Sequence, residues 1–182
     1  MSAVIDKKEE PAPQLKLDLG CGKNKAAGFH GVDSMQFDGV DTVLDLRVTP
    51  WPWADDSVDE VHSSHFVEHL TNNERVKFWN ELGRVMKKGA QARVITPHWS
   101  NACAYGDPTH QWPPMSEWYA YYLNKGWRDV NAPHAGLTCD FDFVIGGSWD
   151  AWLEVRNMDT RVFAMSRYIN SYRDLIVTLT KR

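Results

Sequence analysis

The stretch Leu15–Gly22 constrains the fold more than any other, because an alternating apolar strand runs directly into a Gly-x-Gly turn. Glycine lets the backbone turn tightly and approach a ligand closely, and parallel sheets use this arrangement to bind nucleotide-like molecules. A single Gly-x-Gly also occurs at strand exits for purely conformational reasons. The function of this turn therefore depends on the residues that come after it in the chain and on their spacing.

Apolar strands alternate with polar connections after this turn. Only six residues separate Gly22 from Phe29, whereas a full crossover helix with its loops needs roughly ten or more. We therefore expect the first crossover helix to be reduced to a turn or two. The sequence predicts strands at residues 15–19, 29–33, 40–44, 57–64, 92–96, 140–145 and 175–180.

The clearest helix begins at Thr71, which forms a T-x-x-E capping box with Glu74. Its apolar residues follow at helical spacing, and the run Lys87–Gly89 is expected to end it, with cations at the negative end and then a glycine. Further helices are predicted at 116–124 and 159–172. Strands interleaved with helices indicate an α/β fold with a mostly parallel sheet, in which ligands bind beyond the carboxyl ends of the strands.

Composition fits one globular domain, with 182 residues, 43% of them hydrophobic and 24% charged. The net charge of −4 and the lack of long basic runs argue against a nucleic-acid partner. No run resembles a membrane span or a signal peptide, and the three cysteines form no C-x-x-C pair, so a cytoplasmic protein without a membrane partner is expected. We expect residues 1–14 to form a flexible tail and 15–182 a single domain.

Two carboxylates stand after the next predicted strands along the chain. Asp33 stands where an acid can accept both hydroxyls of a ribose, and Asp45 could accept a hydrogen bond from an adenine amino group. Either acid alone could equally be a solvated loop residue or a helix cap. Their register with successive strand ends favours a nucleoside site.

An ordered set of motifs resembles the class I S-adenosylmethionine-dependent methyltransferases, and most of all their small type 11 methyltransferase-domain proteins. The resemblance covers residues 15–97 well and the remainder loosely. It implies a Rossmann-like, mostly parallel seven-stranded sheet with an antiparallel last strand, and S-adenosyl-L-methionine as cofactor. The motifs are Leu17–Gly22, Gly31–Asp33, Asp45–Leu46, Asp59–Val61, Glu68–His69, Arg84–Gly89 and Val94–Pro97.

The same resemblance implies a cofactor half at about 15–97 and a substrate or cover half at about 98–182. The methionine part would lie at the glycine turn, the ribose at Asp33, the adenine at Asp45, and the sulfonium side at the end of the fourth strand. The implied cofactor-binding residues are Asp18, Gly20, Cys21, Gly22, Asp33, Ser34, Asp45, Leu46, Ser64 and His65.

Methyl transfer from a sulfonium is an in-line displacement that depends on positioning, and an oxygen or nitrogen acceptor must also lose a proton. Histidine is the natural base near neutral pH, and His110 and His65 are the candidate catalytic residues. An aromatic-rich loop comes after Pro97, although its rings could equally fill the core. The predicted substrate-binding residues are His98, Trp99, Tyr105, Asp107 and His110.

Other functions compete with methyl transfer to a small molecule. His65-x-x-Glu68-His69 matches the inverted zinc-peptidase motif, but it follows a predicted strand and lacks a clear third ligand, so no metal is expected. A nucleic-acid or protein methyltransferase remains an alternative, although Ser63–Phe66 lacks the Asn/Asp-Pro-Pro-aromatic turn of amino-directed DNA enzymes. A cofactor-binding module without catalytic activity is a further alternative.

Overall fold

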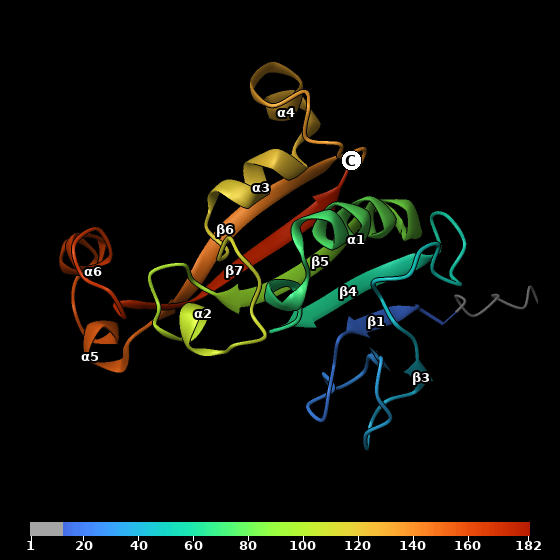
Figure 1. The fold of residues 1–182 in the computed structure, drawn as a ribbon, viewed down its shortest axis with the longest axis horizontal. Coiled ribbons are helices and arrows are strands. Elements are labelled where there is room, and N and C mark those ends of the chain that lie inside the picture. Colours follow the sequence, from blue (N-terminus) through green and yellow to red (C-terminus); the bar gives the residue numbers. More distant parts are fainter. Residues whose placement is uncertain (1–12) are drawn as a thin grey trace, which may run out of the picture.

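The computed structural model describes residues 13–182, whose strands form one seven-stranded sheet in the order β3-β2-β1-β4-β5-β7-β6 (Figure 1). All neighbouring pairs are parallel except those of β7, which runs antiparallel to β5 and to β6. The predicted fold class is confirmed, whereas the expected tail at 1–14 lies almost wholly outside the described residues. The strands are β1 Lys16–Leu19, β2 His30–Asp33, β3 Thr42–Val43, β4 Val58–Ser64, β5 Met86–Pro97, β6 Phe141–Trp149 and β7 Tyr172–Lys181.

The connection from β1 to β2 contains turns and no helix, so the prediction of a short first helix is wrong. Its backbone is held instead by hydrogen bonds to the sheet. The Gly20 amide donates to the Val32 carbonyl at 2.8 Å, and the Ala26 amide donates to the Asp18 carboxylate at 2.7 Å. The loop therefore lies against the strand ends, and a crossover of this length leaves no chain to cover the sheet.

Helix α1 spans Asn72–Val85 and begins with the predicted capping box between Thr71 and Glu74. The helix ends earlier than predicted, because Lys87–Gly89 already belong to β5. Met86 pairs with Val58 and Gln91 with Glu60, so these residues bulge out of the ladder, and Gly89 takes a left-handed φ of 80° there. The cations and glycine thus shape the entry to a strand rather than a helix end.

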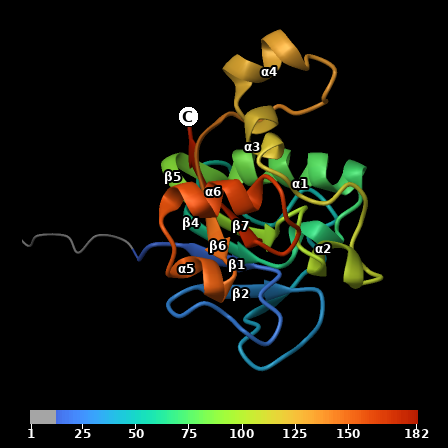
Figure 2. The ribbon, with the colours of Figure 1, turned by 90° about the vertical axis from the view of Figure 1, so that its left-hand side faces the viewer.

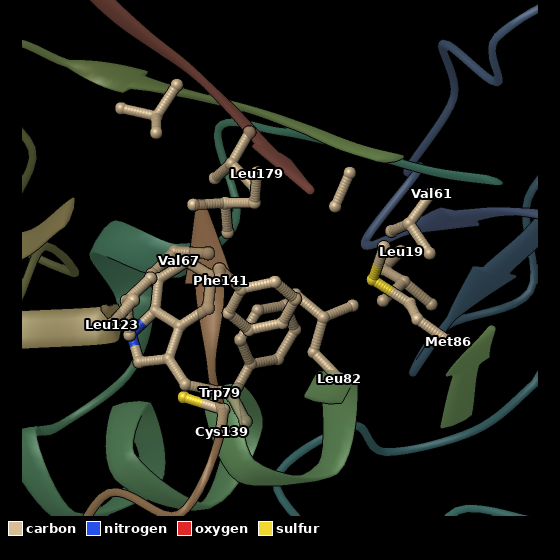
Figure 3. Packing of buried hydrophobic residues seen from close by; sticks show 14 of the residues in the cluster. Leu19, Val61, Val67, Trp79, Leu82, Met86, Leu123, Cys139, Phe141 and Leu179 are labelled. Carbon is tan, nitrogen blue, oxygen red and sulfur yellow. The ribbon is translucent and has the colours of Figure 1, made fainter. Parts of the chain in front are cut away.

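One face of the sheet carries the core, and we call it the covered face. A row of paired apolar residues crosses five strands on this face: Leu17, Val61, Ala92, Leu179 and Phe143. Trp79 and Leu82 of α1 pack over it, as Figure 3 shows. A Cβ on Gly83 would lie 2.8 Å from that of Cys139, so the absence of a side chain lets α1 approach the segment that leads into β6 closely.

The opposite face, which we call the open face, carries polar and exposed residues. Its central row pairs Asp18, His62, Arg93, Thr178 and Val144 across the same five strands. Val144 is 71% exposed, and the helices α1 and α3 both lie over the covered face (Figures 1 and 2). The helix-free crossover leaves this face without a covering helix from the first connection. Its strands therefore alternate polar and apolar side chains, as strands with one solvated face do.

Short helices in the second half gather mainly around the carboxyl ends of the parallel strands. Figure 1 shows α2, α5 and α6 at that end, near the arrowheads of β4 and β5. The helix predicted at 116–124 is α3, and the one predicted at 159–172 is shorter, because the chain turns directly after Met165 and Tyr172 already belongs to β7. The bounds are α2 Cys103–Gly106, α3 Trp118–Leu123, α4 Lys125–Asn131, α5 Ala151–Glu154 and α6 Met158–Met165.

Within residues 13–182, no helix has both the length and the apolar character needed to cross a membrane. Cys21, Cys103 and Cys139 are free thiols, as their spacing predicts.

Candidate active site

His65 stands directly after β4 and adopts a left-handed backbone with φ of 54°, which is unusual for a residue other than glycine. Its amide donates to the Ile95 carbonyl at 2.9 Å, which ties this bend to β5. The ring lies between two carboxylates, with Nδ1 3.2 Å from Glu68 and Nε2 3.7 Å from Asp174. Glu68 raises the pKa of the His65 imidazole above its usual 6.5, against the opposing effect of partial burial.

Three clefts meet at His65. The first, which we call the cofactor cleft, has a volume of about 370 Å³ and is lined by predicted residues Gly20, Gly22, Asp33, Ser34, Asp45 and Leu46. A small cleft of about 190 Å³ contains Asp18, Cys21 and Ser64. A wide cleft of about 820 Å³ opens on the other side and includes Asp107 and His110. The predicted cofactor residues therefore lie together, next to a separate and larger space.

The carboxylates of the cofactor cleft already have partners. Asp33 accepts hydrogen bonds from the Gly22 amide at 2.9 Å and the Met35 amide at 3.0 Å. Asp45 accepts two bonds from the guanidinium of Arg47, at 2.8 and 2.9 Å, and this pairing lowers the pKa of the Asp45 carboxyl. Each carboxylate has further acceptor capacity for a ligand, because its two oxygens offer about four lone-pair sites. Their assigned roles toward ribose and adenine stay predictions.

Gly20 is required by a close contact as well as by its φ of 72°. A Cβ at this position would lie 2.4 Å from the ring of Phe66, so only glycine lets that ring pack over the turn. Phe66 itself lines the cofactor cleft together with Leu70 and Arg47. None of these three was predicted, because a ring and a cation after a strand carry no signal of their own.

Asp18 is 1% exposed, projects from the open face of the sheet and lines the small cleft. One carboxylate oxygen lies 2.8 Å from Nδ1 of His62, while the other accepts the Ala26 amide. The buried acid thus joins β1, β4 and the first loop. It holds the glycine turn in place where a crossover helix is missing.

The five predicted substrate residues divide between two spaces. Asp107 and His110 line the wide cleft, whereas His98, Trp99 and Tyr105 line a separate aromatic cleft of about 520 Å³ with Trp112 and Trp118. His98 is 1% exposed, and its ring nitrogens lie 2.7 Å from Ser100 Oγ and 3.0 Å from Glu117 Oε1. In this position His98 braces the loop after β5.

The wide cleft also contains residues that sequence patterns did not indicate. Arg173 and Asp174 come from the start of β7, which the antiparallel pairing with β5 brings beside Pro97. Asn101 and Cys103 come from the loop and the short helix after β5. Topology alone brings these positions together, since more than seventy residues separate Pro97 from Arg173.

The histidine motif of zinc peptidases adopts a different geometry here. Val67–His69 forms a single 3₁₀ turn, and His65 precedes it with a left-handed φ, so the motif does not lie within a helix. The two imidazoles of the motif are therefore not presented from successive helical turns, as a peptidase site requires.

Residues 33–94 match the type 11 methyltransferase family, which is described as a methyltransferase domain. A solved S-adenosylmethionine-dependent methyltransferase from Archaeoglobus fulgidus is similar, with 19% identity and a TM-score of 0.65 over 93% of this chain and 87% of that one. A chain of the complex of the Haloferax volcanii Trm112 methyltransferase activator with a methyltransferase has 18% identity and a TM-score of 0.56. It covers 95% of this chain and 85% of that one.

The YcgJ protein of Bacillus subtilis is a further structural neighbour, with 14% identity and a TM-score of 0.52 over 94% of this chain and 93% of that one. The comparison with curated proteins finds no relative. At these identities the solved structures show the fold, while the family match is limited to residues 33–94. The chain therefore shares the fold of solved S-adenosylmethionine-dependent methyltransferases, and its residues 33–94 are similar to a methyltransferase domain.

Proposed function

We propose that the protein transfers the methyl group of S-adenosylmethionine to an oxygen or nitrogen of a small molecule bound in the wide cleft. The observation that carries this proposal is the position of His65, which borders the cofactor cleft, the small cleft and the wide cleft at once. A methyl donor on one side of this residue and an acceptor on the other would face each other there. In-line displacement needs this arrangement.

The predicted cofactor-binding residues are assigned roles from their positions in the clefts. Asp33 binds the ribose hydroxyls, Asp45 and the Leu46 backbone contact the adenine, and the small cleft beside Asp18 receives the methionine part. Phe66 packs on the glycine turn and closes one wall. The cleft has carboxylates but no cluster of cations among its lining residues, which suits a cofactor without phosphates.

His65 acts as the base that removes the acceptor's proton, and Glu68 and Asp174 hold its ring. His110 is the second candidate, because it also lines the wide cleft and its Nε2 lies 3.9 Å from Asp107. A general base contributes roughly 10²–10⁴-fold to turnover. A cytoplasmic location stays a prediction from the sequence.

The proposal is tested with the full chain by calorimetry and by turnover. Asp33→Ala should weaken S-adenosylmethionine binding about tenfold, which corresponds to the loss of one good polar contact of about 1.4 kcal/mol. His65→Ala should keep the affinity and lower the release of S-adenosylhomocysteine by roughly 10²-fold or more. His134→Ala, an exposed histidine far along the chain, is the matched control.

Unchanged turnover in His65→Ala would remove His65 as the base, and unchanged cofactor affinity in Asp33→Ala would overturn the site assignment. The acceptor panel includes small alcohols, phenols, carboxylates and amines, with RNA, DNA and protein extracts as separate arms. Methylation confined to a macromolecular arm would replace the small-molecule proposal. Cofactor binding without product in every arm would favour a binding module.

A further inference from the structure

Glu68, His69 and His110 converge at the wall between two clefts. Each offers one ligand atom, and these three atoms lie within 4.8 Å of one another. His69 lines the cofactor cleft and His110 lines the wide cleft, while Glu68 lies buried between them. Two imidazoles and one carboxylate form a donor set that first-row transition metals use with open coordination positions.

The carboxylate of Glu68 is an independent sign of a missing ligand. Its side chain is 5% exposed, and neither of its oxygens has a hydrogen-bond partner among the described residues. The 3.2 Å contact with His65 is an ion-pair contact without hydrogen-bond geometry. The His65 imidazole and the Arg75 guanidinium lie close enough to offset part of the charge of Glu68, but both of its oxygens remain available as ligands.

The hydrogen-bond network prepares both imidazoles as ligands. Thr109 Oγ1 donates to Asp107 at 2.6 Å, so its oxygen must accept from Nδ1 of His69, which lies 2.9 Å away. Nδ1 of His110 faces the Ala104 carbonyl at 3.3 Å, and a carbonyl can only accept. This network assigns the proton to Nδ1 in both rings and leaves both Nε2 lone pairs without a hydrogen bond from the described residues, as second-shell partners do for metal-binding histidines; Asp107 lies 3.9 Å from Nε2 of His110.

The backbone around the cluster is held firmly. The Gln111 amide donates to the Glu68 carbonyl at 2.8 Å, and the buried guanidinium of Arg75 donates to the carbonyls of Glu68, Gln111 and Pro113. These bonds fasten the turn that carries Glu68 and His69 to the loop that carries His110. Only small side-chain movements are then needed to bring each ligand atom to the roughly 2.0–2.2 Å of a metal bond.

We propose that Glu68, His69 and His110 bind a divalent transition-metal ion of the zinc type. The proposal of this ion depends only on the geometry of its three ligands and does not depend on methyl transfer. A role for the ion in catalysis rests on the proposed function. In that role, an open coordination position toward the wide cleft would hold an oxygen of the acceptor. The sequence pattern predicted no metal, because the third ligand stands 41 residues after His69 and outside the His65–His69 motif.

The test uses the full chain, stripped of metal with a chelator and titrated with Co²⁺ alone, whose visible spectrum reports its ligands. One Co²⁺ should bind per chain and be displaced by Zn²⁺. His110→Ala and Glu68→Gln should each weaken binding by at least about tenfold, whereas His134→Ala should bind as the unchanged chain does.

A further variant keeps every ligand in place. Thr109→Val removes the acceptor of the His69 Nδ1 proton, together with the hydrogen bond from Thr109 Oγ1 to Asp107, and should weaken Co²⁺ binding about tenfold while circular dichroism shows an intact fold. The proposal is overturned if no Co²⁺ binds, or if these variants bind it as tightly as the unchanged chain. Binding of S-adenosylhomocysteine, measured on the same stripped samples, tests the cofactor site separately.

Discussion

The two faces of the sheet differ in what they supply to the protein. The covered face holds a continuous apolar layer, with Leu17, Leu82 and Leu179 fully buried. The open face has polar side chains, an ion pair between Lys16 and Glu60 at 2.6 Å, and exposed Val144. Burial of apolar area dominates stability, whereas exposed ion pairs contribute little. Most of the stability therefore comes from one side of the sheet.

The open face contributes to the site instead. Asp18, His62 and Ser64 all project on this side and line the small cleft next to the glycine turn. A crossover helix in this place would cover them, so the short first connection exposes polar strand residues to the ligand space. Loss of a covering helix thus costs apolar burial on one face but makes that face available for binding.

Leu82→Ala should have the largest effect on stability. Leu82 is fully buried under the covered face, and its truncation leaves a cavity that lowers the free energy of unfolding by about 2–5 kcal/mol. Chemical denaturation measures this loss. Arg93→Ala on the exposed central row should change it by less than about 0.5 kcal/mol, and equal losses in both variants would show that the two faces do not differ as described.

Glu81→Gln tests the one carboxylate of α1 that is buried at the edge of the covered face. Glu81 accepts the Trp51 amide at 2.7 Å and pairs with Arg84, and its loss should cost about 1–3 kcal/mol at neutral pH. Burial acts to raise the pKa of the Glu81 carboxyl, but Arg84 and the Trp51 amide outweigh it, and the net pKa lies below the usual 4.5.

The sign of the pH effect follows from this lowered pKa. The stabilisation is present above about 4.5, the pKa in the unfolded chain, and is lost as the pH falls through the lower folded value. Thermal melts between neutral and acidic pH should therefore fall less steeply in Glu81→Gln. Glu60→Gln on the open face is the matched control, and an acid dependence that both variants alter alike would contradict this account.

Asp18→Asn should affect the cofactor more than the fold. The substitution keeps the size of the side chain but removes the charge that faces His62, and it offers one acceptor where the acid offers two. We expect affinity for S-adenosylhomocysteine to fall about tenfold, or about 1.4 kcal/mol, measured by calorimetry. An unchanged affinity would show that the buried acid of the open face does not contribute to cofactor binding, and would contradict the functional difference between the two faces.

Local patterns predicted the elements whose signals are contained in a few neighbouring residues. The capping box of Thr71 and Glu74, the alternating residues of the strands and the Gly-x-Gly pattern at Gly20 can each be recognised within a few neighbouring residues. The boundaries that failed depend on pairing with distant strands. Lys87–Gly89 have the residues of a helix end, but the ladder with β4 makes them the bulged start of β5.

The grouping of the residues in the cofactor cleft was predictable because they follow successive parallel strands, whose carboxyl ends must share one edge. Asp33, Asp45 and Gly20 accordingly line one cleft. The rest of the site was not predictable, since Asp174 reaches His65 only through the antiparallel pairing of β7, and the side chains of His69 and His110 meet only because two loops are fastened together.

The sequence by itself determined the class of fold and grouped Gly20, Asp33 and Asp45 at one edge of the sheet, because alternating strands and glycine turns are local patterns. Only the tertiary structure decided that His98 is buried, that His65 borders three clefts and that Glu68 lacks a hydrogen-bond partner among the described residues. Burial and convergence are properties of the whole packed chain, so no stretch of neighbouring residues contains them.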